Sequence, residues 1–297
     1  MNTHLTAGVL SGALTSLLLH PLDVLKVRFQ VQDGVVNAIK YRSLQGALQD
    51  VWKFEGFRGF YRGAMPAMLG SSASWGFYFY FYELCKNRMS GKVAPGDLSE
   101  APPSGRLSSP QLAYAAWEAG TITCLLTNPI WLIKTRMQLQ TGATRAPYAS
   151  ALHALTSIFR EDGIPGLYRG IVPALFLTLH GVIQFVVYER MKEAAGEQGA
   201  SASSGTVVSA ALVSKVAAAT ATYPYQVAKS RLQQRFEGKP EYSGLWDCTK
   251  KTWIKEGVLG FYKGFLANVL RVAPSSALTL LCYESVRESL EKWNKNL

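Results

Sequence analysis

The sequence predicts an all-α membrane protein, with six membrane-spanning helices in three tandem repeats and one short amphipathic helix within each repeat. Three observations support this fold class. Of the 297 residues, 48% are hydrophobic and 17% are charged. The stretches Leu5 to Leu19 and Leu167 to Val187 carry almost no charge, over a length that crosses or nearly crosses a bilayer. Three sequence motifs also recur in step along the chain.

The first motif contains a proline and occurs as HPLDVLKVRF, NPIWLIKTRM and YPYQVAKSRL, with Pro21, Pro129 and Pro224. The second is a glycine-rich turn, present as EGFRGFYRG, DGIPGLYRG and EGVLGFYKG. The third is a Tyr-Glu pair followed by a base, in YELCK, YERMK and YESVR. Because the three motifs share one spacing, one unit occurs three times. The expected repeats are residues 1–100, 101–200 and 201–297.

Each unit is expected to contain the same elements in the same order. A long apolar helix ends near the proline motif, a short amphipathic helix follows, and the glycine-rich turn leads into a second apolar helix closed by the Tyr-Glu pair. The polar stretches KVAPGDLSEAPPSGR and GEQGASASSG separate the units and are typical of surface linkers. Most of the 31 Lys and Arg residues fall in the loops within the units. The positive-inside rule places those loops in the interior compartment, with both termini on the other side.

Several classes of function find no support in the sequence. The first residues lack a basic segment and a cleavage site, so we expect no removable targeting peptide. The four cysteines are scattered without metal-ligand spacing, which argues against a disulfide framework or a zinc site. The glycine-rich turns fit neither the P-loop nor the Rossmann fingerprint. No paired catalytic carboxylates or activated nucleophile are evident, so an enzyme or a bound cofactor is not expected.

The triplicated Px[DE]xx[KR]x[KR], EGxxGxY[KR]G and [FY][DE]xx[KR] patterns resemble the mitochondrial carrier family over nearly the whole chain. The resemblance implies a multi-pass protein of the mitochondrial inner membrane with pseudo-threefold symmetry and its amphipathic helices on the matrix side. Within the family, HPLDVLKVRFQVQDG, NPIWLIKTR, HGVIQFVVYE and ATYPYQV are most similar to the folate/FAD carriers.

Charges in the proline motif predict a gate at one end of a central cavity. Asp23 and Lys26 are three residues apart and share a helix face, and the prolines bring the helix ends together. In the family's scheme Asp23 pairs with Lys134. Since the other two acid positions hold tryptophan and glutamine, Trp131 is expected to give Lys229 a cation–π contact and Gln226 to bond Lys26. The predicted matrix gate is Asp23, Lys26, Trp131, Lys134, Gln226 and Lys229, braced by Gln30, Gln138 and Gln233.

The alternative for these charges is that they extend to lipid headgroups. A second set closes the other end of the cavity in the family's scheme, and two gates imply alternating access. Its members are all present, so we expect the unloaded protein to favour the state closed on the cytosolic side. The predicted cytoplasmic gate is Glu83, Lys86, Glu189, Lys192, Glu284 and Arg287.

The substrate level follows from the register of the second helix of each unit. Thirteen residues before the glutamates of that gate lie Gly70, Phe176 and Arg271, which the resemblance makes the substrate-contact level. An arginine in a spanning segment is costly and usually faces water, a partner or a ligand, and it can grip carboxylate or phosphate with two hydrogen bonds. The predicted substrate-binding residues are Arg271, Trp75, Ser71, His180, Gln184 and Tyr78.

The aromatic residues of that set could equally pack in the bundle or face lipid, and His180 has no second metal ligand on its face. The roles of Glu118 and Lys215, which lie inside expected spans, stay open. By resemblance the glycine-rich turns bind cardiolipin headgroups; the alternative is a plain helix-capping turn. The predicted lipid-binding residues are Arg62, Gly63, Arg169, Gly170, Lys263 and Gly264.

The function that the resemblance implies is transport of folate, FAD or both, as substrates rather than cofactors. A carrier of another nucleotide, such as NAD or a pyrimidine nucleotide, is the alternative, because those relatives also have tryptophan at the position of Trp131. A membrane enzyme and a purely structural or receptor protein have less support. We expect a monomer, since one chain supplies all three units, and no nucleic-acid partner.

Overall fold

The structure is a computed structural model, and it describes residues 3–32, 41, 43–90, 109–141, 147–194, 204–235 and 241–295. Within these ranges the protein contains ten helices and no strand. Both predicted linkers fall almost entirely outside the described residues. The helices are α1 (Thr3–Gln30), α2 (Leu44–Phe60), α3 (Ala64–Met89), α4 (Ser109–Gln138), α5 (Ala151–Leu167), α6 (Ile171–Leu177), α7 (His180–Ala194), α8 (Ser204–Gln233), α9 (Leu245–Gly260) and α10 (Phe265–Lys295).

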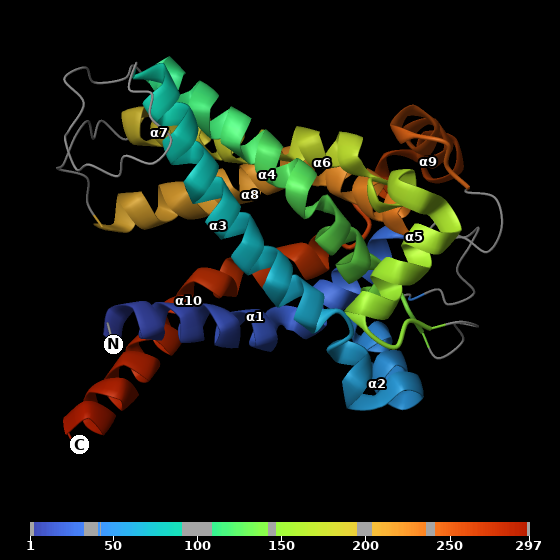
Figure 1. Cartoon of the computed structure of the whole chain (residues 1–297), viewed down its shortest axis with the longest axis horizontal. Coiled ribbons are helices and arrows are strands. Elements are labelled where there is room, and N and C mark those ends of the chain that lie inside the picture. Colours follow the sequence, from blue (N-terminus) through green and yellow to red (C-terminus); the bar gives the residue numbers. More distant parts are fainter. Residues whose placement is uncertain are drawn as a thin grey trace.

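The long helices lie roughly along the longest axis of the molecule, and the three short helices α2, α5 and α9 gather at one end (Figure 1). We call this the basic end. Helix α1 begins and α10 ends at the opposite end, which we call the terminal end. The long helices converge at the basic end and spread apart toward the terminal end.

The proline-containing helices run further than the sequence predicts. Helices α1, α4 and α8 contain Pro21, Pro129 and Pro224 inside their spans, and each continues nine residues beyond its proline. A helical proline bends its helix because it removes one hydrogen bond and crowds the preceding turn. The segment after each proline carries the predicted gate residues, so this extension positions the site.

The second apolar helix of the middle unit is broken, whereas the sequence predicts a continuous span. The amides of Thr178 and Leu179 donate to the carbonyls of Leu175 and Phe176, at 3.1 and 3.2 Å. These i to i+3 bonds tighten the chain locally and separate α6 from α7. By length and hydropathy, one segment of the described residues, Ile171–Ala194, is apolar enough to cross a membrane.

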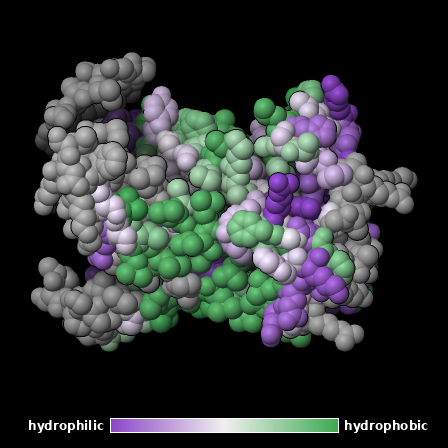
Figure 2. Space-filling view, turned by 90° about the horizontal axis from the view of Figure 1, so that it is seen from below, coloured by the Kyte–Doolittle hydropathy of each residue, from purple (hydrophilic) through white to green (hydrophobic). Residues whose placement is uncertain are grey.

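Apolar side chains form a wide patch on the face seen in Figure 2, while hydrophilic side chains gather at the basic end. Large apolar residues are exposed along the long helices, among them Leu69 (54%), Phe79 (59%) and Leu126 (48%). A contiguous apolar surface of this kind fits contact with lipid or another protein better than contact with water.

The buried core lies at the basic end, in three clusters that each pack a short helix on the proline-containing helix of its own unit. Leu25 packs with Val51 and Phe60, and Leu132 packs with Ile158. Ala228 packs with Cys248 in the third unit. The three short helices are therefore fixed in equivalent positions, and each one places an acidic residue beside the site.

Candidate functional site

Three buried arginines, one per unit, form ion pairs with an acid of the short helix that follows them. They lie five residues beyond the acid position of each proline motif, and their exposed fractions are 3% or less. The Nε of each arginine also donates to a backbone carbonyl of the next unit. The ion pairs are Arg28–Glu55 (2.5 Å), Arg136–Asp162 (3.2 Å) and Arg231–Glu256 (2.7 Å); the accepting carbonyls are those of Gln138 (3.0 Å), Gln233 (3.2 Å) and Gln30 (3.0 Å).

These contacts form a closed ring, because the third unit binds the first. Each arginine ties its own short helix to the neighbouring proline-containing helix, so the ring fixes the three units at the basic end. Burial alone raises the pKa of Glu256, but the hydrogen bonds from Arg231 and Lys263 outweigh it and hold the pKa below its usual value. The carboxylate is therefore charged at neutral pH and able to hold both cations.

The same acids bind the basic residues of the glycine-rich turns, which the sequence predicts as lipid ligands. Each turn cation is one-quarter to one-third exposed and already paired within its unit. The pairs are Arg62–Glu55 (3.1 Å), Arg169–Asp162 (3.1 Å) and Lys263–Glu256 (2.6 Å). Each of these cations thus already has an acidic partner within the protein, and a lipid headgroup that bound the cation would do so beside that acid.

The glycines of these turns lie close against the backbone of the next unit. Gly63, Gly170 and Gly264 have φ of 77°, 77° and 79°, a region that favours glycine. A Cβ atom on each would lie 2.9 Å from the carbonyl oxygen of Lys134, 3.2 Å from that of Lys229 and 2.8 Å from that of Lys26, respectively. A side chain at these positions would push the gate helices away.

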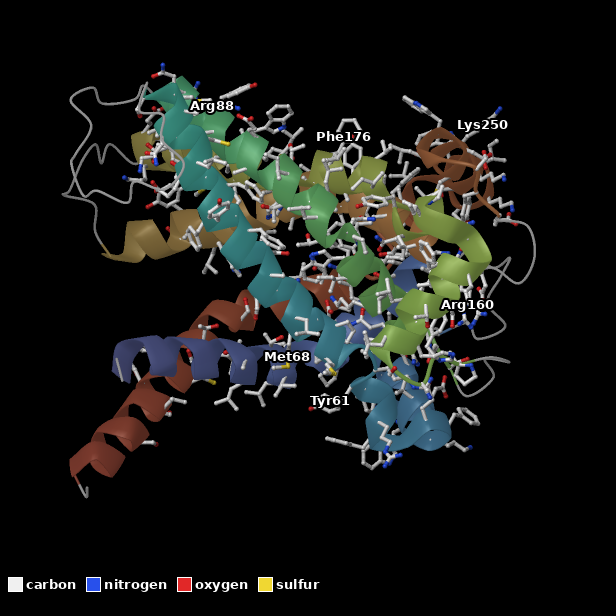
Figure 3. All side chains as sticks on the ribbon, viewed as in Figure 1. Tyr61, Met68, Arg88, Arg160, Phe176 and Lys250 are labelled. Atoms are coloured by element: carbon white, nitrogen blue, oxygen red, sulfur yellow. The ribbon has the colours of Figure 1, made fainter. Side chains whose placement is uncertain are left out.

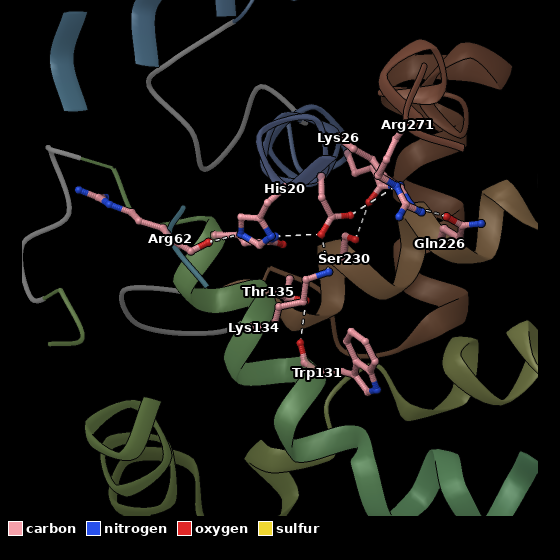
Figure 4. Close-up of polar contacts among 12 residues, drawn as sticks. His20, Lys26, Arg62, Trp131, Lys134, Thr135, Gln226, Ser230 and Arg271 are labelled. Atoms are coloured by element: carbon pink, nitrogen blue, oxygen red, sulfur yellow. Dashed lines mark hydrogen bonds and ion pairs between the residues drawn. The ribbon is translucent and has the colours of Figure 1, made fainter. Parts of the chain in front are cut away.

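Above the ring lie the residues that the sequence predicts as the matrix gate. With Arg271 they form what we call the basic-end cluster: Asp23, Lys26, Trp131, Lys134, Gln226, Lys229 and Arg271. Asp23 on α1 and Lys134 on α4 form an ion pair of 2.5 Å, in which both side chains are about 15% exposed or less. This is the cross-unit pair expected from the family's scheme; Figure 4 labels Lys134 together with Lys26, Gln226 and Arg271 of the same cluster.

The third unit joins the first through an amide. Lys26 Nζ donates to Gln226 Oε1 at 2.8 Å, as expected for glutamine at an acid position. The predicted contact of Trp131 with Lys229 is wrong, since Lys134 Nζ lies over the Trp131 ring at 5.3 Å. Trp131 and Lys134 are three residues apart on α4 and share a face. The indole Nε1 instead donates to Ser74 Oγ on α3 at 3.2 Å.

The three bracing glutamines lie directly below the cluster. Gln138 Nε2 donates to Asp23 Oδ2 at 3.0 Å and so supports the gate acid itself. Ser230 Oγ donates to Gln30 Oε1 at 2.7 Å, and Thr135 Oγ1 donates to Gln233 Oε1 at 2.9 Å. All three glutamines are almost fully buried, so this layer excludes water beneath the gate.

Arg271 on α10 belongs to the gate cluster as well as to the predicted substrate level. Its Nε lies 3.7 Å from Asp23 Oδ1, and its side chain is 34% exposed. Asp23 therefore carries two cations from two other units. About a third of its side chain is exposed, and its Nε is buried without a hydrogen-bond partner, which leaves the arginine able to bind an anion.

Two predicted substrate residues on α3 are part of aromatic stacks. Trp75 is 61% exposed and stacks on Phe79 with ring centroids 5.6 Å apart. Tyr78 is partly buried and stacks on Tyr82 at 6.0 Å. Ser71, one turn before Trp75, is exposed. Trp75 and Tyr78 thus present aromatic surface, and neither makes a cation–π contact with Arg271 among the described residues.

On α7, His180 Nδ1 lies 3.0 Å from Thr222 Oγ1 of α8, so it joins two helices and is partly buried. Gln184, one turn further along, is partly buried as well. Phe176 stacks on Tyr225 at 5.0 Å and lies at the edge of the bundle in Figure 3. Gly70 is buried, and a Cβ there would lie 3.2 Å from Ile130. The same Cβ would lie 3.4 Å from the Trp131 ring, so Gly70 packs against the cluster, and of the three contact-level residues Arg271 is the one that brings a charged side chain to it.

The predicted cytoplasmic gate is disengaged. Lys86 contacts Glu83 on its own helix at 3.1 Å, and Lys192 lies over the Tyr188 ring of its own helix. Glu189 and Glu284 make no ion pair among the described residues. The side chain of Arg287 lies outside the described part of the chain. The structure is therefore closed at the basic end, through the Asp23–Lys134 pair and the bond from Lys26 to Gln226, which is the state opposite to the one expected for the unloaded protein.

Glu118, whose role the sequence left open, pairs with Arg88 of α3, which lies near the terminal end in Figure 3. The pair joins α3 to α4. Lys215 of α8 lies within Coulombic range of Arg271.

Sequence reasoning missed the residue before each proline. His20 Nε2, Asn128 Nδ2 and Tyr223 Oη donate to backbone carbonyls of the glycine-rich turn of their own unit, at 3.1, 2.9 and 3.1 Å. The accepting carbonyls are those of Arg62, Leu167 and Lys263. The signal was present as a hydrogen-bond donor at one position of all three motifs, but the residue type differs each time.

A separate cavity of about 460 Å³ lies where the second turn meets the third unit. Its walls include Tyr168 to Pro173 on one side and Tyr242 to Leu245 on the other. Two predicted lipid ligands, Arg169 and Gly170, line it. No group of three or more His, Cys, Asp or Glu side chains that could hold a metal occurs among the described residues.

Comparison with known proteins identifies related chains. The family model described as "Mitochondrial carrier protein" matches residues 1–93, 105–199 and 201–293. The chain is 40% identical to "Folate transporter 1, chloroplastic" of Arabidopsis thaliana, over 97% of this chain and 95% of that protein. It is 36% identical to "Nicotinamide adenine dinucleotide transporter 1, chloroplastic" of the same plant, over 96% and 90%. It is 30% identical to "Mitochondrial FAD carrier protein FLX1" of Saccharomyces cerevisiae, over 96% of each chain.

Proposed function

The chain belongs to the mitochondrial carrier family, and from this premise we propose that it transports folate, FAD or both across the mitochondrial inner membrane by alternating access. The six long segments, α1, α3, α4, α6 with α7, α8 and α10, cross the membrane in three pseudosymmetric repeats. The basic end faces the matrix, and one monomer forms the whole pathway. It is a transporter rather than an enzyme.

The observation that carries this proposal is the basic-end cluster. Asp23, Lys134, Lys26 and Gln226 link helices of three units by contacts of 2.5 and 2.8 Å, at the point where the helices converge. Contacts of this kind can break and re-form without disturbing the buried ring below them. The residues thus suit a gate that opens to release substrate.

The substrate assignment rests on Arg271 and the aromatic residues of α3. The partly exposed Arg271 side chain suits a carboxylate or phosphate, and Trp75 offers a face to a flat ring. Folate and FAD each combine a heteroaromatic ring with an anionic tail. The named specificities of two relatives, a folate transporter and an FAD carrier, support the same choice.

Reconstitution tests this proposal. The purified full chain in liposomes should take up labelled folate or FAD, and unlabelled substrate should compete better than NAD or pyrimidine nucleotides. Uptake of neither compound would contradict the assignment. Two relatives are named as chloroplastic, so the location also needs a test. Fractionation of cells that express a tagged chain should find it in the mitochondrial inner membrane.

NAD is the second candidate substrate. It is favoured by the 36% identity to a protein named as an NAD transporter and by Trp131 at an acid position of the gate. In the same liposomes, uptake of NAD that exceeds that of folate and FAD would favour this candidate.

We also propose that the glycine-rich turns bind cardiolipin. The cavity beside Arg169 and Gly170 supports this, since it opens next to a turn that carries a cation. Replacing Arg62, Arg169 and Lys263 together by glutamine should reduce the thermal stabilisation that cardiolipin gives. An unchanged cardiolipin response in a folded triple variant would count against the proposal, and a lower stability without lipid would reflect the lost ion pairs.

A further inference from the structure

The basic-end cluster contains far more positive than negative charge. Lys26 lies within Coulombic range of Lys134, Lys229 and Arg271, and Asp23 is the one acid among them. The two other acid positions hold Trp131 and Gln226, which are neutral. Closely spaced like charges repel one another, and the repulsion is strong where water is partly excluded. The closed gate therefore lacks counter-charge.

The three gate lysines differ in how they are satisfied. Lys134 has the carboxylate of Asp23 at 2.5 Å, and Lys26 has the amide oxygen of Gln226 at 2.8 Å. Lys229 makes no side-chain hydrogen bond or ion pair with any residue that the structure describes. Its side chain is partly buried, so an unsatisfied ammonium there is costly.

The position of Lys229 is fixed although its charge is not satisfied. Gly170 packs against its backbone carbonyl, and its neighbours Val227 and Ala228 are buried. Lys229 is three residues beyond Gln226 and shares its helix face, so it lies beside the contact with Lys26. A bound anion at this point would face two ammonium groups at once.

We propose that the transported anion completes this gate by placing one of its negatively charged groups on Lys229, with Lys26 as the neighbouring cation. The inference rests on the proposed function and deepens it. Its ligand is an organic anion with at least two negative charges, either a dicarboxylate or a diphosphate. One anionic group contacts Arg271 and the other contacts Lys229.

This arrangement selects for charge. A neutral or singly charged analogue would leave Lys229 unsatisfied, and a site with an unpaired buried group rejects such an analogue strongly. Lys229 is thus a substrate contact, whereas Lys134 is a gate contact. The two roles predict different kinetic changes, because a lost substrate contact lowers affinity and a lost gate contact lowers the maximal rate.

The test compares charged ligands with less charged analogues by thermal-shift titration of the full chain. Folate is paired with pteroate, which lacks the glutamate, and FAD is paired with riboflavin, which lacks the diphosphate. In Lys229→Gln the dissociation constant for the charged member should rise by about tenfold or more, in the range of a lost charge-assisted hydrogen bond, while that for the analogue stays unchanged. Lys229→Arg should retain most of the preference.

Lys255→Gln is the matched control, since it removes a lysine that is 45% exposed on α9, outside the cluster. Unchanged affinity of Lys229→Gln for folate and FAD would overturn the inference and leave the proposed function intact. If Lys229→Gln does not fold, the wild-type protein decides, because equal affinity for charged ligand and analogue overturns the inference as well. A wild-type protein that binds none of folate, FAD and NAD would overturn both proposals.

Discussion

At the basic end, polar contacts run between helices of different units: Lys134 to Asp23, Lys26 to Gln226, and Arg231 to the Gln30 carbonyl. At the terminal end, Lys86 contacts Glu83 on its own helix, and Arg190 likewise contacts Glu193. Ion pairs of exposed neighbours on one helix stabilise little, whereas breaking a buried pair is costly. The same types of charged residue therefore link the units through buried contacts at the basic end, whereas at the terminal end these two pairs stay within one helix and the Arg88–Glu118 pair that joins two units is partly exposed.

The largest expected effect lies in the buried ring. Arg231→Gln should lower the free energy of unfolding by about 3–5 kcal/mol, because it removes the buried ion pair with Glu256, which keeps only Lys263, and the bond to the Gln30 carbonyl. The control is Arg190→Gln at the terminal end, whose side chain is 79% exposed. Thermal unfolding of the two purified variants measures the difference in stability. Similar unfolding midpoints for both variants would contradict the distinction between the two ends.

Arg271 tests whether ligand binding is linked to the gate at the basic end. Arg271→Ala should abolish transport and remove the stabilisation by folate or FAD, which is about 2.7 kcal/mol at a ligand concentration of 100 times Kd. Lysine should restore little, since it lacks the planar fork. Thermal-shift titrations measure both variants. A wild-type ligand shift in Arg271→Ala would show that Arg271 does not hold the anion and acts through Asp23 alone.

The gate lysine should show a smaller effect that is confined to rate. Lys134→Gln should reduce the initial rate of uptake at saturating substrate by about tenfold, or about 1.4 kcal/mol, because Asp23 loses its nearest cation. The ligand-induced thermal shift should persist. Lys229→Gln is expected to impair the maximal rate less, and equal loss of rate in both variants would argue against separate roles.

The smallest effect is expected at the pair that joins helices near the terminal end. Glu118→Gln removes the partner of Arg88, whose side chain is 57% exposed, so the loss of stability should be about 0.2–1 kcal/mol. Glu83→Gln serves as the control within one helix. A loss as large as that of Arg231→Gln would mean that the terminal end is held together as firmly as the basic end.

The repeated parts of the fold were accessible from the sequence because one pattern occurs three times. The motif spacing predicts three copies of a long helix, a short helix and a turn, and the described helices follow that order. The pairing of Asp23 with Lys134 and of Lys26 with Gln226 followed from the resemblance to the mitochondrial carrier family, in whose scheme the acid position of one unit pairs with the base of the next. These contacts depend on backbone positions that every copy shares.

The features that sequence reasoning missed depend on how far a side chain extends, or on which of the two gates is closed. Trp131 was assigned to Lys229 by unit order, but Lys134 lies one turn away on the same helix and covers the ring. Arg271 was placed by register alone, yet its long side chain reaches Asp23. The sequence also shows which partners each gate has without showing which gate is engaged, so closure at the basic end could not be derived from it.

The closed ring also constrains how the protein is made. Arg231 binds the Gln30 carbonyl, and Lys263 Nζ donates to the Gln32 carbonyl at 2.5 Å. The first unit can therefore complete its contacts only after residues more than two hundred positions later have been synthesised. A nascent chain that ends before the third unit exposes the half of the interface that Gly264 and Arg231 would cover. Biogenesis must therefore keep the first two units soluble or inserted until the last one arrives, and C-terminal truncation removes the contacts that close the first unit onto the third.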